Sequence, residues 1–153
     1  MASWDLEYRP TRSPRYAWVI AIVLVAVHVT FGALMRVSNT GTNFRVTDEV
    51  GLAMIGVVLA GCVLLFTRPR LRVGPDGVGV RNLFAERVFD WEAVRGIWYP
   101  DKGAWARLEL PEYEHVPVMA VQALDGESAV SAMARFRELR EEYGVLSGEQ
   151  PPK

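Results

Sequence analysis

Hydrophobic residues form two unbroken runs in the first half of the chain and alternate with polar residues in the second half. The first run, residues 17–35, contains no Asp, Glu, Lys or Arg and is long enough to cross the hydrocarbon core of a bilayer. The second run, residues 50–66, is equally free of charge and lies at the lower length limit for a span. The pattern predicts two transmembrane helices joined by a short external loop at residues 36–49.

The distribution of arginine around these runs sets their expected orientation. Three arginines precede the first run and three follow the second, whereas the two in the connecting loop are offset by Asp48 and Glu49. Loops rich in Lys and Arg stay in the cytoplasm. The sequence therefore predicts a two-pass plasma-membrane protein with both termini in the cytoplasm, beginning with a cytoplasmic segment at residues 1–16.

Small residues and one histidine in the runs are candidates for helix packing. Ala17 and Ala21 lie four residues apart in the first run, as do Gly56 and Ala60 in the second. Such faces let helices approach closely, either within a hairpin or against an external membrane protein. His28 lies near mid-membrane depth without an acidic partner in either run, and we interpret it as bonding to a neighbouring helix.

From residue 68 onward the hydrophobic period changes to two, which indicates short strands. A tight turn is predicted at Gly74-Pro75-Asp76-Gly77, because these residue types favour turns. After residue 122 the period becomes helical, with Asp125 as the expected N-cap and an apolar stripe reaching Gly144. Six or seven strands are expected, near residues 71–73, 78–83, 86–91, 94–99, 105–110 and 116–122.

The order of these elements predicts an α+β fold. A two-helix transmembrane hairpin comes first, followed by a small antiparallel β-barrel or sandwich at residues 68–144. The C-terminal helix caps the open end of the strands, and residues 145–153 are expected as a flexible tail.

Several short motifs in the second half resemble a known family. They are the Asp76-Gly77-Val78 turn, the Arg81-Asn82 pair and Asp90-Trp91-x-x-Val94-x-Gly96, in this order. With the membrane segment ahead of them, they resemble the actinobacterial membrane-anchored pleckstrin-homology-like family that includes the low molecular weight protein antigen 6 proteins. The resemblance covers residues 68–143 and implies a pleckstrin-homology-like fold, and none of its motifs is catalytic.

The sequence offers no chemistry for catalysis, a metal or a cofactor. Gly74, Gly77 and Gly79 fall in an expected hairpin rather than in a phosphate-binding loop, and Cys62 is the only cysteine. His115 lies beside Glu112 and Glu114, but the other histidine is in a membrane run and cannot complete a metal site. The net charge of −1 excludes nucleic acid as an expected partner. We therefore expect a protein that is not an enzyme and has no cofactor.

Two tryptophans are the candidate contacts for a protein partner. Strand alternation turns Trp98 outward if Ile97 faces the core, and it turns Trp105 outward if Leu108 faces the core. The pair is either a cross-strand contact that stabilises the hairpin or a binding surface, since tryptophan is enriched in hot spots. The candidate contacts for phospholipid headgroups are Arg72, Arg81, Arg95 and Lys102, of which Lys102 lies in the turn between the two tryptophans.

The absence of a spacer between the second run and the first strand limits the reach of the domain. Three arginines within five residues end the membrane segment, and the alternating pattern starts at once. This favours a partner at the membrane surface over a soluble metabolite. The leading hypothesis is a non-catalytic accessory or scaffold subunit of an actinobacterial plasma-membrane complex, with another integral membrane protein as its partner. The alternative is a sensor of anionic phospholipid headgroups.

Overall fold

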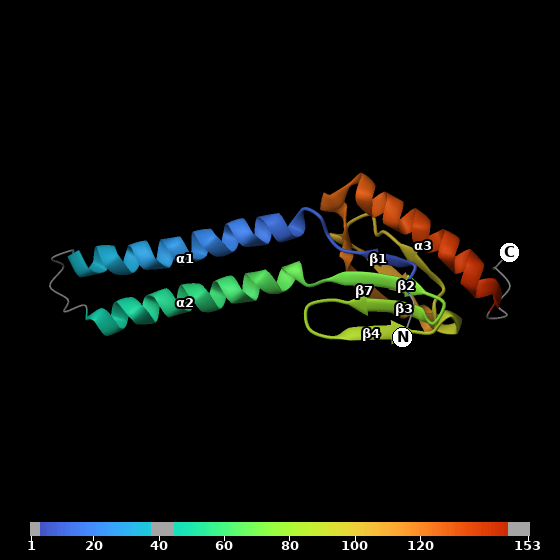
Figure 1. Ribbon diagram of the computed structural model, residues 1–153, viewed down its shortest axis with the longest axis horizontal. Helices are drawn as coiled ribbons and strands as arrows, with labels where there is room; N and C mark the ends of the chain where they lie inside the picture. Colours follow the sequence, from blue (N-terminus) through green and yellow to red (C-terminus); the bar gives the residue numbers. More distant parts are fainter. Residues whose placement is uncertain (1–3, 38–44, 147–153) are drawn as a thin grey trace. The chain divides into compact units, whose positions relative to one another are not determined.

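The chain divides into two compact units in a computed structural model that describes residues 4–37 and 45–146. One unit, residues 14–67, is a helical hairpin, and the other combines the N-terminal segment with the chain from Arg68 onward (Figure 1). Part of the expected external loop, residues 38–44, lies outside the described residues, and so does most of the expected tail, residues 147–153.

The hairpin contains the two helices that the hydrophobic runs predict. Helix α1 spans Ser13–Val37, and helix α2 spans Val46–Leu64 and continues into the 3₁₀ turn η1, Leu65–Thr67. Both are long and apolar enough to cross a membrane. In each helix, only 11% of the 18-residue apolar stretch is buried. They are therefore not core helices of a soluble domain, because such helices bury their apolar side chains. At the start of α2, the backbone N–H of Arg45 donates a hydrogen bond to Asp48 Oδ2 over 2.9 Å.

Within the described residues, the second unit contains seven strands in two antiparallel sheets, followed by helix α3, Glu127–Leu146. The first sheet has the order β1-β2-β3-β4 and the second the order β5-β6-β7. The two sheets do not close into a barrel, so the α+β sandwich with a C-terminal helix is confirmed. The strands are β1 Leu6–Tyr8, β2 Arg70–Gly74, β3 Gly77–Arg81, β4 Glu86–Phe89, β5 Gly96–Trp98, β6 Trp105–Glu109 and β7 His115–Gln122.

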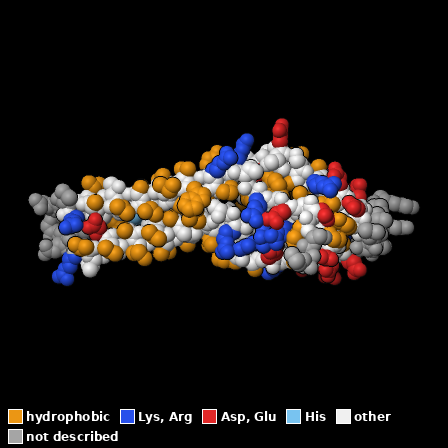
Figure 2. Space-filling model, viewed as in Figure 1, with side chains coloured by type: hydrophobic (Ala, Val, Ile, Leu, Met, Phe, Trp, Pro, Cys, Tyr) orange, Lys and Arg blue, Asp and Glu red, His pale blue; other side chains and the backbone are white. Residues whose placement is uncertain are grey.

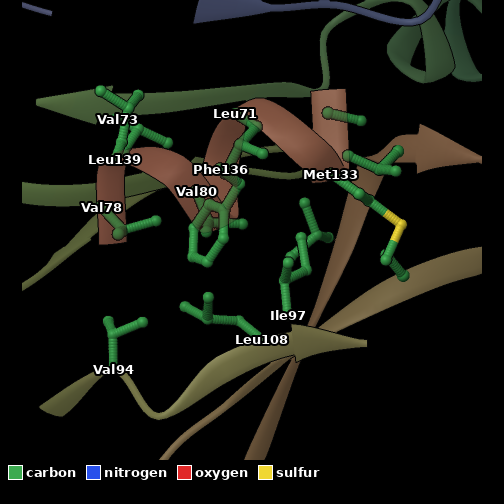
Figure 3. Packing of buried hydrophobic residues seen from close by; sticks show 14 of the residues in the cluster. Leu71, Val73, Val78, Val80, Val94, Ile97, Leu108, Met133, Phe136 and Leu139 are labelled. Atoms are coloured by element: carbon green, nitrogen blue, oxygen red, sulfur yellow. The ribbon is translucent and has the colours of Figure 1, made fainter. Parts of the chain in front are cut away.

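The hydrophobic core lies between the two sheets and α3 (Figure 3). Phe136 and Leu139 of α3 are fully buried among side chains of both sheets, such as Leu71 and Leu108. In β2 the inward positions match the predicted alternation, because Leu71 and Val73 are buried while Arg70 and Arg72 are only partly covered. The same alternation holds in β6, whereas β4 and β7 do not alternate regularly between buried and exposed residues. The alternation in the sequence therefore predicted the buried positions of β2 and β6 correctly.

The turn between β2 and β3 requires glycine at position 77. Gly77 has a φ of 130°, which L-residues rarely adopt. A Cβ at this position would lie 2.3 Å from the carbonyl oxygen of Phe89 on β4. The Asp76-Gly77-Val78 motif behind the family resemblance therefore serves the fold, since it lets β4 approach the turn.

Strand β1 comes from the N-terminal segment, which the sequence pattern did not place in the domain. It pairs antiparallel with β2, with Leu6 opposite Val73 and Tyr8 opposite Leu71. The chain then leaves for the hairpin and returns to form β2. The helical hairpin is therefore an insertion between two neighbouring strands of one sheet.

Asp125 fastens the N-terminal segment and is not the N-cap of α3 as expected. Helix α3 begins at Glu127, and the Asp125 carboxylate, only 4% exposed, points to the N-terminal segment instead. Its Oδ1 accepts hydrogen bonds from the backbone N–H groups of Thr11, at 3.1 Å, and Arg12, at 2.9 Å, and from the Thr11 hydroxyl, at 2.9 Å. Its Oδ2 lies 3.3 Å from the donating Tyr8 hydroxyl. The sequence predicted a bond from this carboxylate to the start of α3, because the N-terminal segment that it binds is more than 100 residues away in the chain.

A second fastening lies at the other end of α3. The Tyr143 hydroxyl donates a 2.6 Å hydrogen bond to Asp5 Oδ2, and this bond raises the pKa of Tyr143 to about 12. Near Asp125, burial raises the pKa of Tyr8, whose hydroxyl also lies 3.0 Å from the Ser128 hydroxyl. The N-terminal segment is thus bonded to both ends of α3.

Candidate interaction surfaces

Trp98 is an outward-facing residue on β5, an edge strand of the second sheet. It is 41% exposed, while its neighbour Ile97 is buried as the alternation predicts. The residue opposite Trp98 is Arg107, whose guanidinium carbon lies 5.5 Å from the centre of the indole ring. Trp105 lies opposite Gln122, beside a bulge in β6. The cross-strand aromatic pair is therefore wrong in register, and a cation–π contact takes its place.

A shallow depression of ≈ 250 Å³ adjoins Trp98. Tyr113 on its rim is 96% exposed, and both Glu112 and Tyr113 have positive φ angles, of 60° and 62°. This turn places an exposed aromatic ring beside acidic side chains, and the sequence alternation gave no signal for it. The residues that line the depression are Trp98, Glu109, Tyr113, Glu114 and His115.

His115, the one candidate metal ligand outside the membrane runs, contacts a cation instead. Its Nε2 lies 3.3 Å from Arg107 Nη1, which donates to it. Across residues 4–37 and 45–146, no three His, Cys, Asp or Glu side chains come together as metal ligands do. The depression is therefore lined by aromatic side chains, acidic side chains and one histidine.

Arg72 is engaged by side chains of its own domain. It lies on β2 with its Nε 3.0 Å from Glu7 Oε2 and its Nη1 3.6 Å from Glu86 Oε1. The Trp4 ring lies 5.9 Å from its guanidinium carbon. A hydrogen bond from Arg9 and the charge of Arg72 lower the pKa of Glu7. The contacts of Arg72 with Glu7 and Trp4 therefore help to hold the N-terminal segment on the domain.

Arg70 and Arg81 face each other across β2 and β3 on the same sheet. Arg70 Nη2 lies 2.6 Å from Glu86 Oε2. The Nε atoms of Arg70 and Arg81 are buried and have no hydrogen-bond partner among the described residues. Figure 2 shows Lys and Arg side chains gathered in one region of the domain surface. Arg81 was a predicted headgroup contact and Arg70 was not, because only the strand register places Arg70 opposite Arg81.

The four predicted headgroup contacts are distributed over both sheets. Arg72 and Arg81 lie on the first sheet, whereas Arg95 and Lys102 are exposed residues in the segments on either side of β5 in the second sheet.

The four small residues predicted to pack in the hairpin are all buried. Gly56 and Ala60 of α2 are buried, as are Ala17 and Ala21 of α1. A Cβ at Gly56 would lie 2.8 Å from the Cβ of His28, so the two helices are close at this level. Gly56 of α2 therefore packs against His28 of α1 within the hairpin.

His28 does not bond to the neighbouring helix as expected. Its Nδ1–H donates to the carbonyl oxygen of Leu24, one turn earlier in α1, over 2.7 Å. Side chains in a helix lean back towards the preceding turn, which brings the His28 ring within reach of this carbonyl. The ring instead packs against Gly56.

Replacing Gly56 with alanine is expected to loosen the hairpin. The new methyl group would overlap the base of the His28 side chain, and overpacking of this kind costs about 1–3 kcal/mol. Gly61→Ala is the matched control, because no atom lies within 4 Å of its Cβ position. Thermal unfolding of both full-length variants in the same detergent would measure the difference. Equal stability of the two variants would show that α1 and α2 do not pack at Gly56.

The chain is similar in sequence to a known protein family and to proteins of two mycobacteria. The family described as Bacterial PH domain matches residues 68–139. Uncharacterized proteins of Mycobacterium tuberculosis and Mycobacterium bovis are each 44% identical over 140 residues, which cover 92% of this chain and 91% of theirs. The similarity therefore extends beyond the matched domain into the helical hairpin. No solved structure matches the chain.

Proposed function

This chain belongs to the family of bacterial PH-domain proteins that includes these mycobacterial relatives, and on that premise we propose that it is a non-catalytic accessory subunit of a plasma-membrane protein complex. In this proposal the hairpin spans the bilayer twice, and both termini and the domain lie in the cytoplasm. The partner is another integral membrane protein. The partner docks on two surfaces of this chain, the outer face of the hairpin and the depression beside Trp98.

The observation that carries the proposal is the insertion of the hairpin between β1 and β2. Only Arg68 and Pro69 separate η1 from β2, and residues 9–12 separate β1 from α1. Fully extended, the connection from Thr67 to Arg70 spans at most about 11 Å. A domain held by two such connections reaches only targets at the membrane surface. This supports a membrane protein as the partner rather than a soluble one.

Two surfaces of the described residues suit such a partner. The hairpin carries an apolar groove of ≈ 630 Å³, whose lining includes Trp18, Ala26 and Gly61. Small side chains in a membrane groove allow another helix to approach closely. The domain offers the Trp98 depression, where the partly exposed indole and Tyr113 are aromatic anchors of the kind enriched in binding hot spots.

Replacing Trp98 and Trp105 together with alanine is expected to reduce copurification of the partner. Loss of a hot-spot residue costs about 2 kcal/mol or more, which is roughly a thirtyfold loss of affinity. The tagged full-length chain would be purified from its native membrane in mild detergent, and the ratio of partner to chain measured. Val130→Ala, at a position 68% exposed on α3, is the control and should leave the ratio unchanged. An unchanged ratio in the double variant would remove this surface from the proposal.

One observation favours the alternative function, recognition of anionic phospholipid headgroups. Arg70 and Arg81 lie opposite each other on β2 and β3, both side chains are partly exposed, and phosphate oxygens are strong acceptors for arginine. Native mass spectrometry of the full-length chain with added phosphatidylglycerol should show bound lipid that is lost in Arg81→Gln. Arg95→Gln, which changes an exposed arginine of the other sheet, should retain it. Equal retention by both variants would exclude a headgroup site at Arg81.

A further inference from the structure

The strand directions identify the end of the domain at which the hairpin is attached. Arg70, where β2 begins, lies opposite Arg81, where β3 ends, and Arg81 lies opposite Glu86, where β4 begins. The β3–β4 loop, residues 82–85, is therefore at the same end of the first sheet as the entry of the chain from α2. The turn at Pro75 and Asp76 is at the opposite end of the sheet.

The β3–β4 loop contains an exposed phenylalanine, and hydrogen bonds to β7 hold the start of this loop. Phe84 is 75% exposed. The side chain of Asn82 holds the start of the loop, because its Nδ2 donates to the Pro117 carbonyl over 2.8 Å and its Oδ1 accepts from the Met119 N–H over 3.1 Å. The exposed ring thus belongs to a loop that is bonded to β7, and the core makes no use of it.

A second exposed apolar side chain marks the other chain connection. Leu124 lies in the 3₁₀ turn η4, Ala123–Asp125, and is 47% exposed. The adjacent Asp125 bonds the backbone of Thr11 and Arg12, directly before α1 begins. Each connection to the hairpin is therefore accompanied by one exposed apolar side chain, Phe84 at one and Leu124 at the other.

Basic residues accompany these two side chains. Arg12 and Arg68 are exposed in the connections themselves, and Arg87 is exposed on β4 close to the loop. Aromatic and aliphatic side chains flanked by arginine are typical of the membrane–water interface, where the apolar group enters the acyl boundary and the cation meets headgroup phosphates.

We propose that Phe84 and Leu124 insert into the interfacial layer of the same bilayer that the hairpin spans. The inference rests on the proposed membrane-spanning topology and adds a contact that neither the hairpin nor the Trp98 depression supplies. With this contact the domain is held at two covalent connections and at a loop, which restricts its rotation about those connections.

A fluorescent label beside Phe84 tests this contact without removing the ring. The full-length chain with Cys62→Ser and Ala85→Cys would carry an environment-sensitive fluorophore at position 85 in vesicles of phosphatidylcholine and phosphatidylglycerol. We expect a blue-shifted emission and strong quenching by lipids that carry a spin label near the headgroup. The same label at Asp76→Cys, at the opposite end of the sheet, should show neither. Adding Phe84→Asp to the Ala85→Cys chain should abolish the quenching, and adding Phe84→Leu should retain it.

A label in the hairpin separates failure of this inference from failure of the topology. Val27→Cys lies in α1 at a position 56% exposed, and lipid spin labels near the acyl-chain ends should quench its fluorophore. Quenching at position 27 with none at position 85 would overturn the loop contact and leave the spanning hairpin intact. Loss of quenching at both positions would refute the membrane-spanning topology itself. A blue shift at position 85 without lipid quenching would indicate a protein contact and would also overturn the inference.

Discussion

Replacing Asp125 with alanine is expected to lower the free energy of unfolding of the domain by about 3 kcal/mol, because it leaves several donors without an acceptor. The buried carboxylate accepts from the backbone N–H groups of Thr11 and Arg12 and from two hydroxyl groups. No other side chain of the described residues is shown to accept from these two N–H groups. The N-terminal segment should therefore detach, and β1 should lose its pairing with β2.

Hydrogen exchange provides the most specific readout of this change. In the full-length Asp125→Ala variant, the amides of residues 5–12 should exchange much faster than in the parent, while those of β6 and β7 change little. Asp125→Asn keeps one oxygen acceptor and should show a smaller effect. Asp76→Ala, which removes an exposed acid from the β2–β3 turn, serves as the control. Unchanged protection of residues 5–12 in Asp125→Ala would show that this carboxylate does not hold the N-terminal segment.

Replacing Trp91 with alanine is expected to destabilise the domain still more, by about 4 kcal/mol, since loss of a buried tryptophan leaves a large cavity. Trp91 is 5% exposed, and its ring centre lies 6.1 Å from that of Phe136 and 5.9 Å from that of Tyr143. Its Nε1–H donates to the carbonyl oxygen of Gly74 over 2.9 Å. The residue thus joins the β2–β3 turn to α3, and its loss affects both.

Two other tryptophan substitutions separate the causes. Trp91→Phe keeps most of the packing and removes the hydrogen bond, so its cost should be about 1–2 kcal/mol. Trp98→Ala changes a partly exposed residue and should hardly alter stability, although it is expected to affect partner binding. Denaturant unfolding of the full-length chains in one detergent, followed by near-ultraviolet circular dichroism, would rank the three variants. Equal loss of stability from Trp91→Ala and Trp98→Ala would contradict the assignment of Trp91 to the core and Trp98 to the surface.

Elements with a clear hydrophobic period could be predicted from the sequence. The two apolar runs correspond to α1 and α2, and the six predicted strands correspond to β2 through β7. Strand β1 could not be predicted in the same way, because Leu6–Tyr8 is too short to establish an alternation. Its partner Leu71–Val73 follows only after both helices, so its pairing depends on long-range contacts.

The candidate contacts show a similar limit. The outward direction of Trp98 followed from alternation, but its partner Arg107 depends on the register of β5 and β6 and could not be read from spacing. The predicted roles of Asp125 and His28 were wrong in opposite ways. Asp125 was expected to cap the following helix, but it accepts from the distant N-terminal backbone. His28 was expected to bond a neighbouring helix, but it donates to the Leu24 carbonyl of its own helix. Polar side chains with several acceptors or donors in reach cannot be assigned from sequence position alone.

The most direct test of the proposed accessory role is the composition of the particle that the chain forms in its own membrane. The tagged full-length protein would be purified in mild detergent from its native membrane, and the mass of the intact particle measured. The account predicts a stoichiometric complex with a larger integral membrane protein, whose identity would define the pathway. A particle that contains this chain alone, or only copies of it with bound lipid, would contradict the accessory role and favour the headgroup sensor.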